Sequence, residues 1–296
     1  MKGKSKMIIA YSILHYNAYE MTCECIEKLM SIMSNESHII VVDNGSPNDS
    51  GESLLAKYSY YSNIHIILTR ENLGFAKGNN VGFEYAKNQI GADIIVVMNN
   101  DVLIQQKDFE CKLEKIASDR TDIAVVAPNI INRNGFNQNP FREKRLKSLY
   151  VCKSLILHEL YYFSIKSGLF KNITLKYYHK NDATSRSREV PEKDVEGIIP
   201  HGSCIIYMQS YIACSREAFI PVTFFYCEED ILYDYLYVKG LKSLYTNSLE
   251  VTHMEKVSTN TIGESTSERE LFQVKNKINS KRAHLRYRVS NGILFR

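Results

Sequence analysis

The sequence predicts an α/β fold built on a mostly parallel central sheet, and three observations lead to this prediction. Four short apolar runs of strand length fall in the first hundred residues, at Met7–Leu14, His38–Val42, Ile64–Leu68 and Asp93–Met98. A stretch of helical periodicity separates each run from the next. The runs are nearly continuous in apolar residues, which is typical of parallel strands covered by helices on both faces. In such sheets, ligands bind at the carboxyl ends of the strands.

The three intervening segments are predicted to be helices. In the first, apolar side chains recur at helical spacing, at Ala18, Met21, Cys25, Leu29 and Met33. Asn17 is expected to cap this helix, with Glu20 three residues later as its capping-box partner. The second helix is weaker and covers Ser50–Tyr58, and the third runs from Phe75 to Ile90.

The second half of the chain is less regular. A helix over Lys107–Ala117 and a strand over Ile123–Ala127 continue the alternation, whereas residues 132–196 are polar, basic and irregular. After this strand we expect an amphipathic stretch at Leu146–Phe170 and a strand at Gly202–Met208. A loop that enters a helix at Phe224–Gly240, a last strand at Lys242–Val251 and a basic tail at Leu271–Arg296 follow. We therefore expect one large domain over residues 1–260, with a variable insert at 132–196, followed by a helical tail at 261–296.

Composition excludes several classes of protein. The 296 residues are 44% apolar and 24% charged, which is ordinary for a globular protein, and the formal charge of +4 does not indicate nucleic-acid binding. The seven cysteines are odd in number and match no zinc spacing, so we interpret them as reduced thiols. No secretory signal opens the sequence, and no apolar stretch reaches the roughly 18 residues of a membrane span. These features favour a cytoplasmic setting.

Two polar segments directly follow predicted strands. In Asn99-Asn100-Asp101, the carboxylate of Asp101 is suited to hold a hard divalent cation if substrate phosphates supply the other oxygens. Asp43, in Asp43-Asn44-Gly45-Ser46, is suited to accept hydrogen bonds from a base or a ribose. Each segment is equally readable as a simple turn that closes its strand.

A glycine-rich segment, Glu71–Gly82, opens the third predicted helix. Gly74, Gly78 and Gly82 recur every four residues and so share one helix face, where a ligand or another backbone segment is able to approach closely. Close packing of the helix on the sheet explains the same pattern. The segment is neither a P-loop nor a dinucleotide-binding fingerprint, because it lacks Gly-Lys-Ser/Thr and does not follow the first strand.

Two further features are late in the chain. Glu228, Glu229 and Asp230 are expected at the start of a helix, where they either complement the helix dipole or supply a general base for a hydroxyl group. His253 follows the last strand, which makes it a candidate metal ligand as well as an ordinary surface or core histidine.

Taken in order, these segments resemble the family-2 inverting glycosyltransferases with the GT-A fold, in particular the branch of bacterial rhamnosyltransferases and galactofuranosyltransferases. The resemblance runs from about Met7 to Ser258, apart from the insert, and rests on the succession V-V-D-N-G-S, E-N-L-G-F-A-K-G-N-N, N-N-D, H-G-S-C, E-E-D and a late histidine. It implies a Rossmann-like, mostly parallel sheet flanked by helices, with a helical insert and a C-terminal helical tail.

The resemblance also implies roles for single residues. Asp43 would bind the base of the nucleotide, and the residues that would line the nucleotide pocket are Asp43, Asn44, Asn72, Gly74, Lys77, Asn79 and Asn100. Asp101 and His253 would hold Mg²⁺ or Mn²⁺. Asp230 would be the catalytic base, with Glu229 beside it. Asn99 stands where many members of the family have a first aspartate, which leaves one carboxylate for the metal ion.

The implied reaction is the inverting transfer of a sugar from dTDP-rhamnose or a UDP-hexose to a glycan or lipid-diphosphate-linked acceptor, as in bacterial surface polysaccharide synthesis. The insert carries a basic group that suggests peripheral contact with an anionic membrane, namely Arg142, Lys144, Arg145, Lys147 and Lys153. A helix packed on the core with a solvated basic face explains these residues equally well. The basic tail over Lys275–Arg288 is interpreted either in the same way or as a homodimer contact.

Two other functions remain open from the sequence. A sugar nucleotidyltransferase would usually carry a glycine-rich, basic loop after its first strand, and His15-Tyr16-Asn17 in that place argues against one. A non-catalytic nucleotide-sugar-binding protein is favoured by Asn99 and opposed by the intact Glu229-Asp230 pair.

Overall fold

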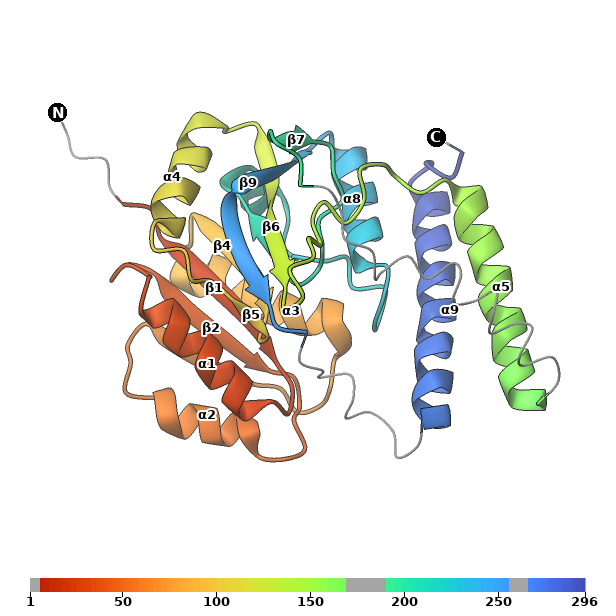
Figure 1. Cartoon of the computed structure of the whole chain (residues 1–296), viewed down its shortest axis with the longest axis horizontal. Coiled ribbons are helices and arrows are strands. Elements are labelled where there is room, and N and C mark those ends of the chain that lie inside the picture. The colour runs from red at the N-terminus through yellow and green to blue at the C-terminus, as the bar shows by residue number, and fades with distance from the viewer. Residues whose placement is uncertain (1–5, 169–189, 256–265, 296) are drawn as a thin grey trace.

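The protein is a layered α/β structure with a pair of long helices beside it (Figure 1). The computed structural model describes residues 6–168, 190–255 and 266–295. Its strands are β1 Ile9–His15, β2 His38–Asp43, β3 Ile64–Leu68, β4 Ile94–Asn99, β5 Val102–Leu103, β6 Ile123–Asn132, β7 Val195–Glu196, β8 Cys204–Tyr207 and β9 Lys242–His253. Its helices are α1 Tyr19–Met30, α2 Ser50–Tyr58, α3 Gly74–Tyr85, the π-helical turn η1 Ala86–Ile90, α4 Phe109–Asp119, α5 Ser148–Ser167, α7 Gln209–Cys214, α8 Glu228–Lys239 and α9 Thr266–Ser290.

One mixed, mostly parallel sheet organises the molecule. The strand order is β3-β2-β1-β4-β8-β6-β9-β5, with β7 on β9. Strands β3, β2, β1 and β4 are parallel, as the first hundred residues predict, and β8 runs antiparallel between β4 and β6. Because β8 runs the opposite way, its first residues lie beside the carboxyl end of β4. Strand β9 is parallel to β6 and pairs antiparallel with β5.

Helices cover both faces of the sheet. Ile13 and Val96 point to one face, where they pack with α1, α2 and α4, whereas Ala10 and Ile95 point to the other, where they pack with α3 and α8. Alternate residues of the same strand therefore enter different halves of the core. This double burial explains why the strands are apolar almost throughout.

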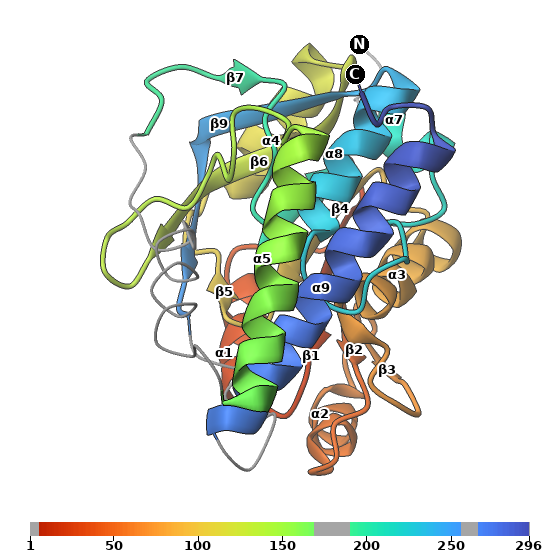
Figure 2. The ribbon, with the colours of Figure 1, turned by 90° about the vertical axis from the view of Figure 1, so that its right-hand side faces the viewer.

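The predicted insert and tail form one structural unit. Helices α5 and α9 lie side by side at the edge of the α/β core, next to α8 (Figure 2). Tyr161 of α5 is buried against Val274 and Ile278 of α9. Within the described residues, no helix is both long and apolar enough to span a membrane.

One local expectation was wrong, and the third helix has an unexpected last turn. Asn17 does not cap α1: the helix follows Ala18 without a side-chain cap, and Asn17 has φ of 61°. Its N–H donates to the Ser46 hydroxyl at 2.9 Å and its carbonyl accepts from Asn48 at 2.9 Å. Asn17 therefore joins the loops after β1 and β2, a tertiary role that the local pattern does not show. The third helix becomes π-helical after Tyr85, and residues 169–170 of the amphipathic stretch lie outside the described residues.

Candidate active site

The antiparallel pairing of β4 and β8 places two motifs side by side. Asn99 ends β4, and its N–H donates to the carbonyl of Ser203, just before β8, at 2.9 Å. This brings His201-Gly202-Ser203 next to Asn99-Asn100-Asp101. The His201 ring is held by a 2.9 Å hydrogen bond between its Nδ1 and the Ser203 hydroxyl. The sequence analysis assigned no role to His201.

Asp101 and His253 meet across the pairing of β5 with β9. The N–H of Met254 donates to the Asp101 carbonyl at 2.8 Å, and the Asp101 Oδ1 lies 3.3 Å from the His253 Nε2. Asp101 is 7% exposed, and the ring centroids of His201 and His253 are 5.7 Å apart. The two residues predicted to hold a metal ion are therefore neighbours.

The hydrogen bonds around His253 fit a metal ligand. Gln138 donates to Glu255 at 2.7 Å through its amide nitrogen, so its amide oxygen faces the His253 Nδ1, also at 2.7 Å. This oxygen can only accept, so the proton is assigned to Nδ1, and Nε2 faces the Asp101 carboxylate. A cation between Nε2 and the carboxylate oxygen would contact both. A second-shell acceptor on the other ring nitrogen is common for metal-binding histidines.

The protein supplies only part of a metal site. Among residues 6–168, 190–255 and 266–295, no cluster of three or more histidine, cysteine or acidic side chains is placed to hold an ion. Mg²⁺ and Mn²⁺ accept such a partial set when substrate phosphates and water complete the coordination. The donor set therefore fits an ion that binds together with a diphosphate.

The loops predicted to bind the nucleotide are tied to each other. The Asn44 amide group donates to Asn72 at 3.1 Å and to the Gly74 carbonyl at 3.2 Å, and its oxygen accepts from the N–H of Leu73 at 2.9 Å. Asn79, lying deeper, donates to the Phe75 carbonyl at 3.0 Å. Lys77 is exposed. These residues form one loop cluster after β2 and β3, which borders the cavity described below through Phe75.

Asp43 and Asn100 are connected through a buried histidine. The Asp43 carboxylate accepts from the Ser46 hydroxyl and lies 3.8 Å from the His15 Nε2, and burial raises the pKa of Asp43. The His15 Nδ1 contacts the Thr22 hydroxyl at 2.7 Å, and that hydroxyl accepts a hydrogen bond from the Asn100 amide at 2.9 Å. Burial lowers the pKa of His15 to about 4, so the ring is neutral. This chain links the ends of β2, β1 and β4, and the sequence analysis missed it.

The glycine stripe has a structural explanation. A Cβ atom on Gly82 would lie 2.0 Å from the Ser12 hydroxyl oxygen, and one on Gly78 would lie 2.7 Å from a methyl group of Leu14. These two glycines let α3 approach β1 closely. Gly74 differs, because it has φ of 80° and lies against the Phe224 carbonyl.

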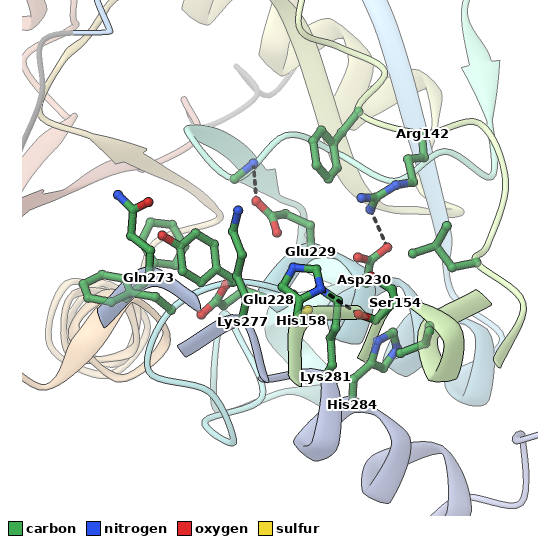
Figure 3. Close-up of a pocket in the computed structure, with 18 of the residues that line it drawn as sticks. Arg142, Ser154, His158, Glu228, Glu229, Asp230, Gln273, Lys277, Lys281 and His284 are labelled. Carbon is green, nitrogen blue, oxygen red and sulfur yellow. Dashed lines mark hydrogen bonds and ion pairs between the residues drawn. The ribbon is translucent and has the colours of Figure 1, made fainter. Parts of the chain in front are cut away.

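A cavity of about 510 Å³ lies between the strand ends, α8 and the α5–α9 pair. Asn99 and His201 line it from the strand ends, and Glu229 and Asp230 line it from α8 (Figure 3). Asp230 is 6% exposed and accepts a 2.6 Å hydrogen bond from the Arg142 guanidinium. The cavity therefore contains the predicted base and lies next to the predicted metal pair.

The turn that leads into α8 is strained. Tyr226 and Cys227 have φ of 75° and 69°, a left-handed conformation that costs non-glycine residues roughly 1–3 kcal/mol each. The Ser280 hydroxyl of α9 donates to the Phe225 carbonyl at 2.6 Å and so holds this turn. Such strain is concentrated at functional sites, and here it directs the acidic end of α8 into the cavity.

The three acidic residues at the start of α8 differ in environment. Burial raises the pKa of Glu228 to about 8, so that carboxyl group is protonated at neutral pH. Burial also raises the pKa of Glu229, whose Oε1 accepts from the Gly202 N–H at 3.2 Å. Asp230 differs from these two in forming a salt bridge with the Arg142 guanidinium group.

A buried ion cluster anchors the α5–α9 pair. Asp234 of α8 is fully buried and accepts from Arg145 at 2.5 Å, from His284 at 2.7 Å and from Arg288 at 2.5 Å. Burial raises the pKa of Asp234, but the hydrogen bonds from His284 and Arg288 outweigh it, and the net shift is downward.

This cluster and the Arg142–Asp230 pair account for three of the basic residues that the sequence left open to a membrane contact, a dimer contact or packing on the core. Arg142 and Arg145 turn inward to Asp230 and Asp234, and Arg288 is 1% exposed. Buried acidic partners attract them, which composition cannot reveal. Within residues 142–153 and 275–288, the basic residues that stay exposed are Lys144, Lys147, Lys153, Lys275, Arg282 and Arg286.

The chain is similar to known proteins over most of its length. The model of the family described as glycosyl transferase family 2 matches residues 12–212. The low-salt glycan biosynthesis hexosyltransferase Agl10 of Haloferax volcanii is 30% identical over 125 residues, which are 42% of this chain and 38% of that protein. Glycosyltransferase GlyG of Streptococcus pneumoniae is 22% identical over 118 residues, 40% of this chain and 38% of that protein. The matched part therefore spans less than half of either relative.

Two solved structures have the same fold. The mannosyltransferase PcManGT of Pyrobaculum calidifontis, in complex with GDP-Man and Mn²⁺, has a TM-score of 0.52 at 10% identity, over 95% of this chain and 75% of that chain. GalNAc-T7 with UDP, GalNAc and Mn²⁺ has a TM-score of 0.56 at 11% identity, over 90% of this chain and 48% of that chain. The GT-A fold predicted from the sequence is confirmed.

Proposed function

The chain belongs to glycosyl transferase family 2, and we propose that it transfers a hexose from a nucleotide diphosphate to an acceptor hydroxyl with inversion. The observation that supports this best is the cavity, which has Asn99 and His201 on one wall and Asp230 on another. The Asp101–His253 pair lies beside the first wall. The two sides of a single displacement are thus both available. The hexosyltransferase among the relatives, and the Mn²⁺ and nucleotide or nucleotide sugar in both solved structures, favour the same reaction.

The leaving group is proposed to bind at the strand ends. Asp101 and His253 would hold Mg²⁺ or Mn²⁺, which as a Lewis acid would stabilise the negative charge of the departing diphosphate. The base of the nucleotide would bind near Asp43, and the loop cluster of Asn44 and Asn72 would form the wall of its pocket. The proposed remaining donor contacts are Gly74, Lys77, Asn79 and Asn100.

The acceptor hydroxyl is proposed to bind beside Asp230. Its proton would pass to the Asp230 carboxylate as the oxygen attacks the sugar from the face opposite the diphosphate. Arg142, at 2.6 Å, orients this carboxylate. A divalent ion held by Asp101 and His253 would assist the leaving group, so no protein acid would be needed on that side, and a single displacement would invert the anomeric carbon.

Donor turnover tests the proposal directly. The purified protein is incubated with dTDP-rhamnose, UDP-hexoses and GDP-mannose, each with Mn²⁺, Mg²⁺ or EDTA, and free nucleotide diphosphate is measured. We expect release from one donor that EDTA abolishes and that Asp101→Ala lowers by about a hundredfold or more, since several kcal/mol of leaving-group stabilisation are removed. Lys77→Gln, in the same loop region but exposed, tests a donor contact without a role in metal binding.

The other outcomes separate the alternatives. Tight donor binding without release, even with acceptors added, would identify a non-catalytic nucleotide-sugar-binding protein. Release of pyrophosphate from sugar phosphate and a nucleoside triphosphate would identify a nucleotidyltransferase. Turnover that is indifferent to both EDTA and Asp101→Ala would refute the metal-assisted mechanism.

The acceptor is proposed to be a glycan or a lipid-diphosphate-linked glycan of a bacterial surface polysaccharide. The cavity that would receive it has an apolar wall from Leu146, Val151 and Leu157 of the insert and from Phe225 and Phe272. Such a wall suits carbon chains and the apolar faces of sugar rings. The branch resemblance, to rhamnosyl- and galactofuranosyltransferases, favours the same class of product.

The outer surface of α5 supports peripheral contact with a membrane. Leu149, Ile156, Leu160 and Phe163 share one face of the helix and are 65%, 57%, 56% and 63% exposed. The same two helices and the segment before α5 also have exposed lysines and arginines. An apolar stripe among basic residues complements a bilayer with anionic headgroups.

Vesicle flotation measures this contact. We expect binding to vesicles that contain phosphatidylglycerol, and a loss of about tenfold or more on replacing Leu160 and Phe163 together with glutamine, since each buried apolar side chain contributes roughly 1.5–3 kcal/mol. Leu55→Gln, an exposed apolar residue of α2, is the control and should bind as the wild type does. If the double variant changed only a dimer to a monomer, the stripe would be a homodimer contact instead.

A further inference from the structure

The α9 wall of the cavity has more positive charge than its acidic residues neutralise. Arg142 is already paired with Asp230, and the raised pKa of Glu228 leaves that carboxyl group uncharged at neutral pH. Lys277 and Lys281 nevertheless line the cavity from α9, with their positions four residues apart on one face of the helix (Figure 3). A cavity with two lysine ammonium groups and an apolar wall is suited to a ligand that has both an anionic group and an apolar part.

Lys281 is the clearest sign of a missing anion. Its side chain is partly buried and forms no hydrogen bond or salt bridge with the residues that the structure describes, although the Asp230 carboxylate is near enough to attract it and Lys277 and Arg142 to repel it. Burial, which disfavours the charged form, lowers the pKa of Lys281. Asp230 is already paired with Arg142, so a ligand that supplies negative charge would compensate the solvation that Lys281 loses. Lys277 is fixed nearby, with its ammonium group 5.3 Å from the centre of the Tyr226 ring.

We propose that Lys281, with Lys277 one turn before it, forms a subsite that binds a phosphate group of the acceptor. The proposal rests on the function proposed above and names the chemical feature by which the acceptor would be recognised. Two phosphate oxygens are able to take charge-assisted hydrogen bonds from the two ammonium groups. The phosphate would then lie on the α9 side of Asp230, and the acceptor sugar would be held against the base.

The position of the lysines favours the acceptor over the donor. The donor diphosphate needs Asp101 and His253, which neighbour Asn99 and His201 at the strand-end wall of the cavity. Lys277 and Lys281 belong to the opposite, helical wall, together with Phe272 of the same helix. A lipid-linked diphosphate supplies both the charge and the carbon chain that this wall fits. A water-soluble phosphate ester supplies only the charge.

Calorimetric titration of the full-length protein without donor or metal tests the subsite. The probes are geranyl diphosphate and inorganic pyrophosphate, and UDP with Mn²⁺ is titrated separately. We expect Lys281→Gln to weaken geranyl diphosphate by about tenfold or more, the scale of one lost charge-assisted hydrogen bond, and to leave UDP–Mn²⁺ unchanged. Lys277→Gln should have a smaller effect in the same direction, and Lys281→Arg should retain binding. Lys275→Gln, on the exposed face of the same helix, is the matched control.

Each outcome has one meaning. If the wild type bound geranyl diphosphate and pyrophosphate equally, and Lys281→Gln lost the same affinity for both, the result would support the subsite and assign it to a water-soluble phosphate. Unchanged geranyl diphosphate binding in both glutamine variants, or an equal loss of UDP–Mn²⁺, would refute it. Since the titration needs no turnover, a protein that releases nucleotide diphosphate from a donor but fails this test would keep the proposed function and lose only the subsite.

Discussion

Asp230→Asn is expected to lower the rate of sugar transfer by about 10²–10⁴-fold and to leave donor binding unchanged. Asparagine has nearly the shape of aspartate and still contacts Arg142, whereas its amide group cannot take the acceptor proton. The effect should therefore appear in kcat with a saturating acceptor. Donor affinity, measured by titration with UDP–Mn²⁺ or its dTDP equivalent, should stay at the wild-type value, because the proposed donor site lies at the strand ends.

Two neighbouring substitutions show whether the effect belongs to Asp230. Glu228→Gln is the control, because burial already keeps that carboxyl group protonated at neutral pH, and transfer should change only a few-fold. Glu229→Gln alters the hydrogen bond to Gly202 and should have an intermediate effect. If Glu229→Gln abolished transfer while Asp230→Asn retained it, the base would be Glu229.

Asp234→Asn is expected to lower the free energy of unfolding by roughly 3–5 kcal/mol, the usual cost of removing one partner from a buried ion pair. Two arginines and a histidine converge on this carboxylate. Arg288 is 1% exposed and has no other acidic partner among the described residues, so without the charge it stays desolvated and uncompensated. Urea denaturation followed by circular dichroism measures the change.

An exposed ion pair in the same region is the control for Asp234. Glu159 of α5 pairs with Arg282 of α9 at 2.7 Å, with both side chains largely in solvent. Glu159→Gln should therefore change the free energy of unfolding by no more than about 1 kcal/mol. Similar losses for the two variants would mean that Asp234 does not anchor the α5–α9 pair.

The fold was predictable because its signals are local. The runs of β1, β2, β3 and β4 are buried on both faces, and burial of that kind leaves a continuous apolar pattern in the sequence. The cap at Asn17 was mispredicted because its backbone N–H and carbonyl bond the loop after β2. Parallel pairing places strand ends together, so the neighbourhood of Asp43 and Asn100 followed from the strands alone.

The site was less predictable, because a sequence shows which residues are charged but not which way their side chains point. Arg142 and Arg145 resemble a membrane-binding segment in composition, and only the position of α8 turns them inward to Asp230 and Asp234. Lys281 is indistinguishable in the sequence from the exposed Lys275. His15, Gln138 and His201 had no motif of their own beyond the family succession. Gln138 and His201 take their places from contacts between segments more than a hundred residues apart, and His15 from contacts with Thr22 and Ser50.

The buried His15 ring lies between the Asp43 and Asn100 ends of the proposed donor site. It bonds the Thr22 and Ser50 hydroxyl groups, Thr22 accepts from the Asn100 amide, and the Asp43 carboxylate lies 3.8 Å from the His15 Nε2. A shift of Asp43 when the base binds would act on this ring and, through Thr22, on Asn100. Binding of the base and binding of the ion would then be coupled, and each should raise the affinity of the protein for the other by the same factor. Nucleobase selectivity measured with and without the divalent ion would differ accordingly.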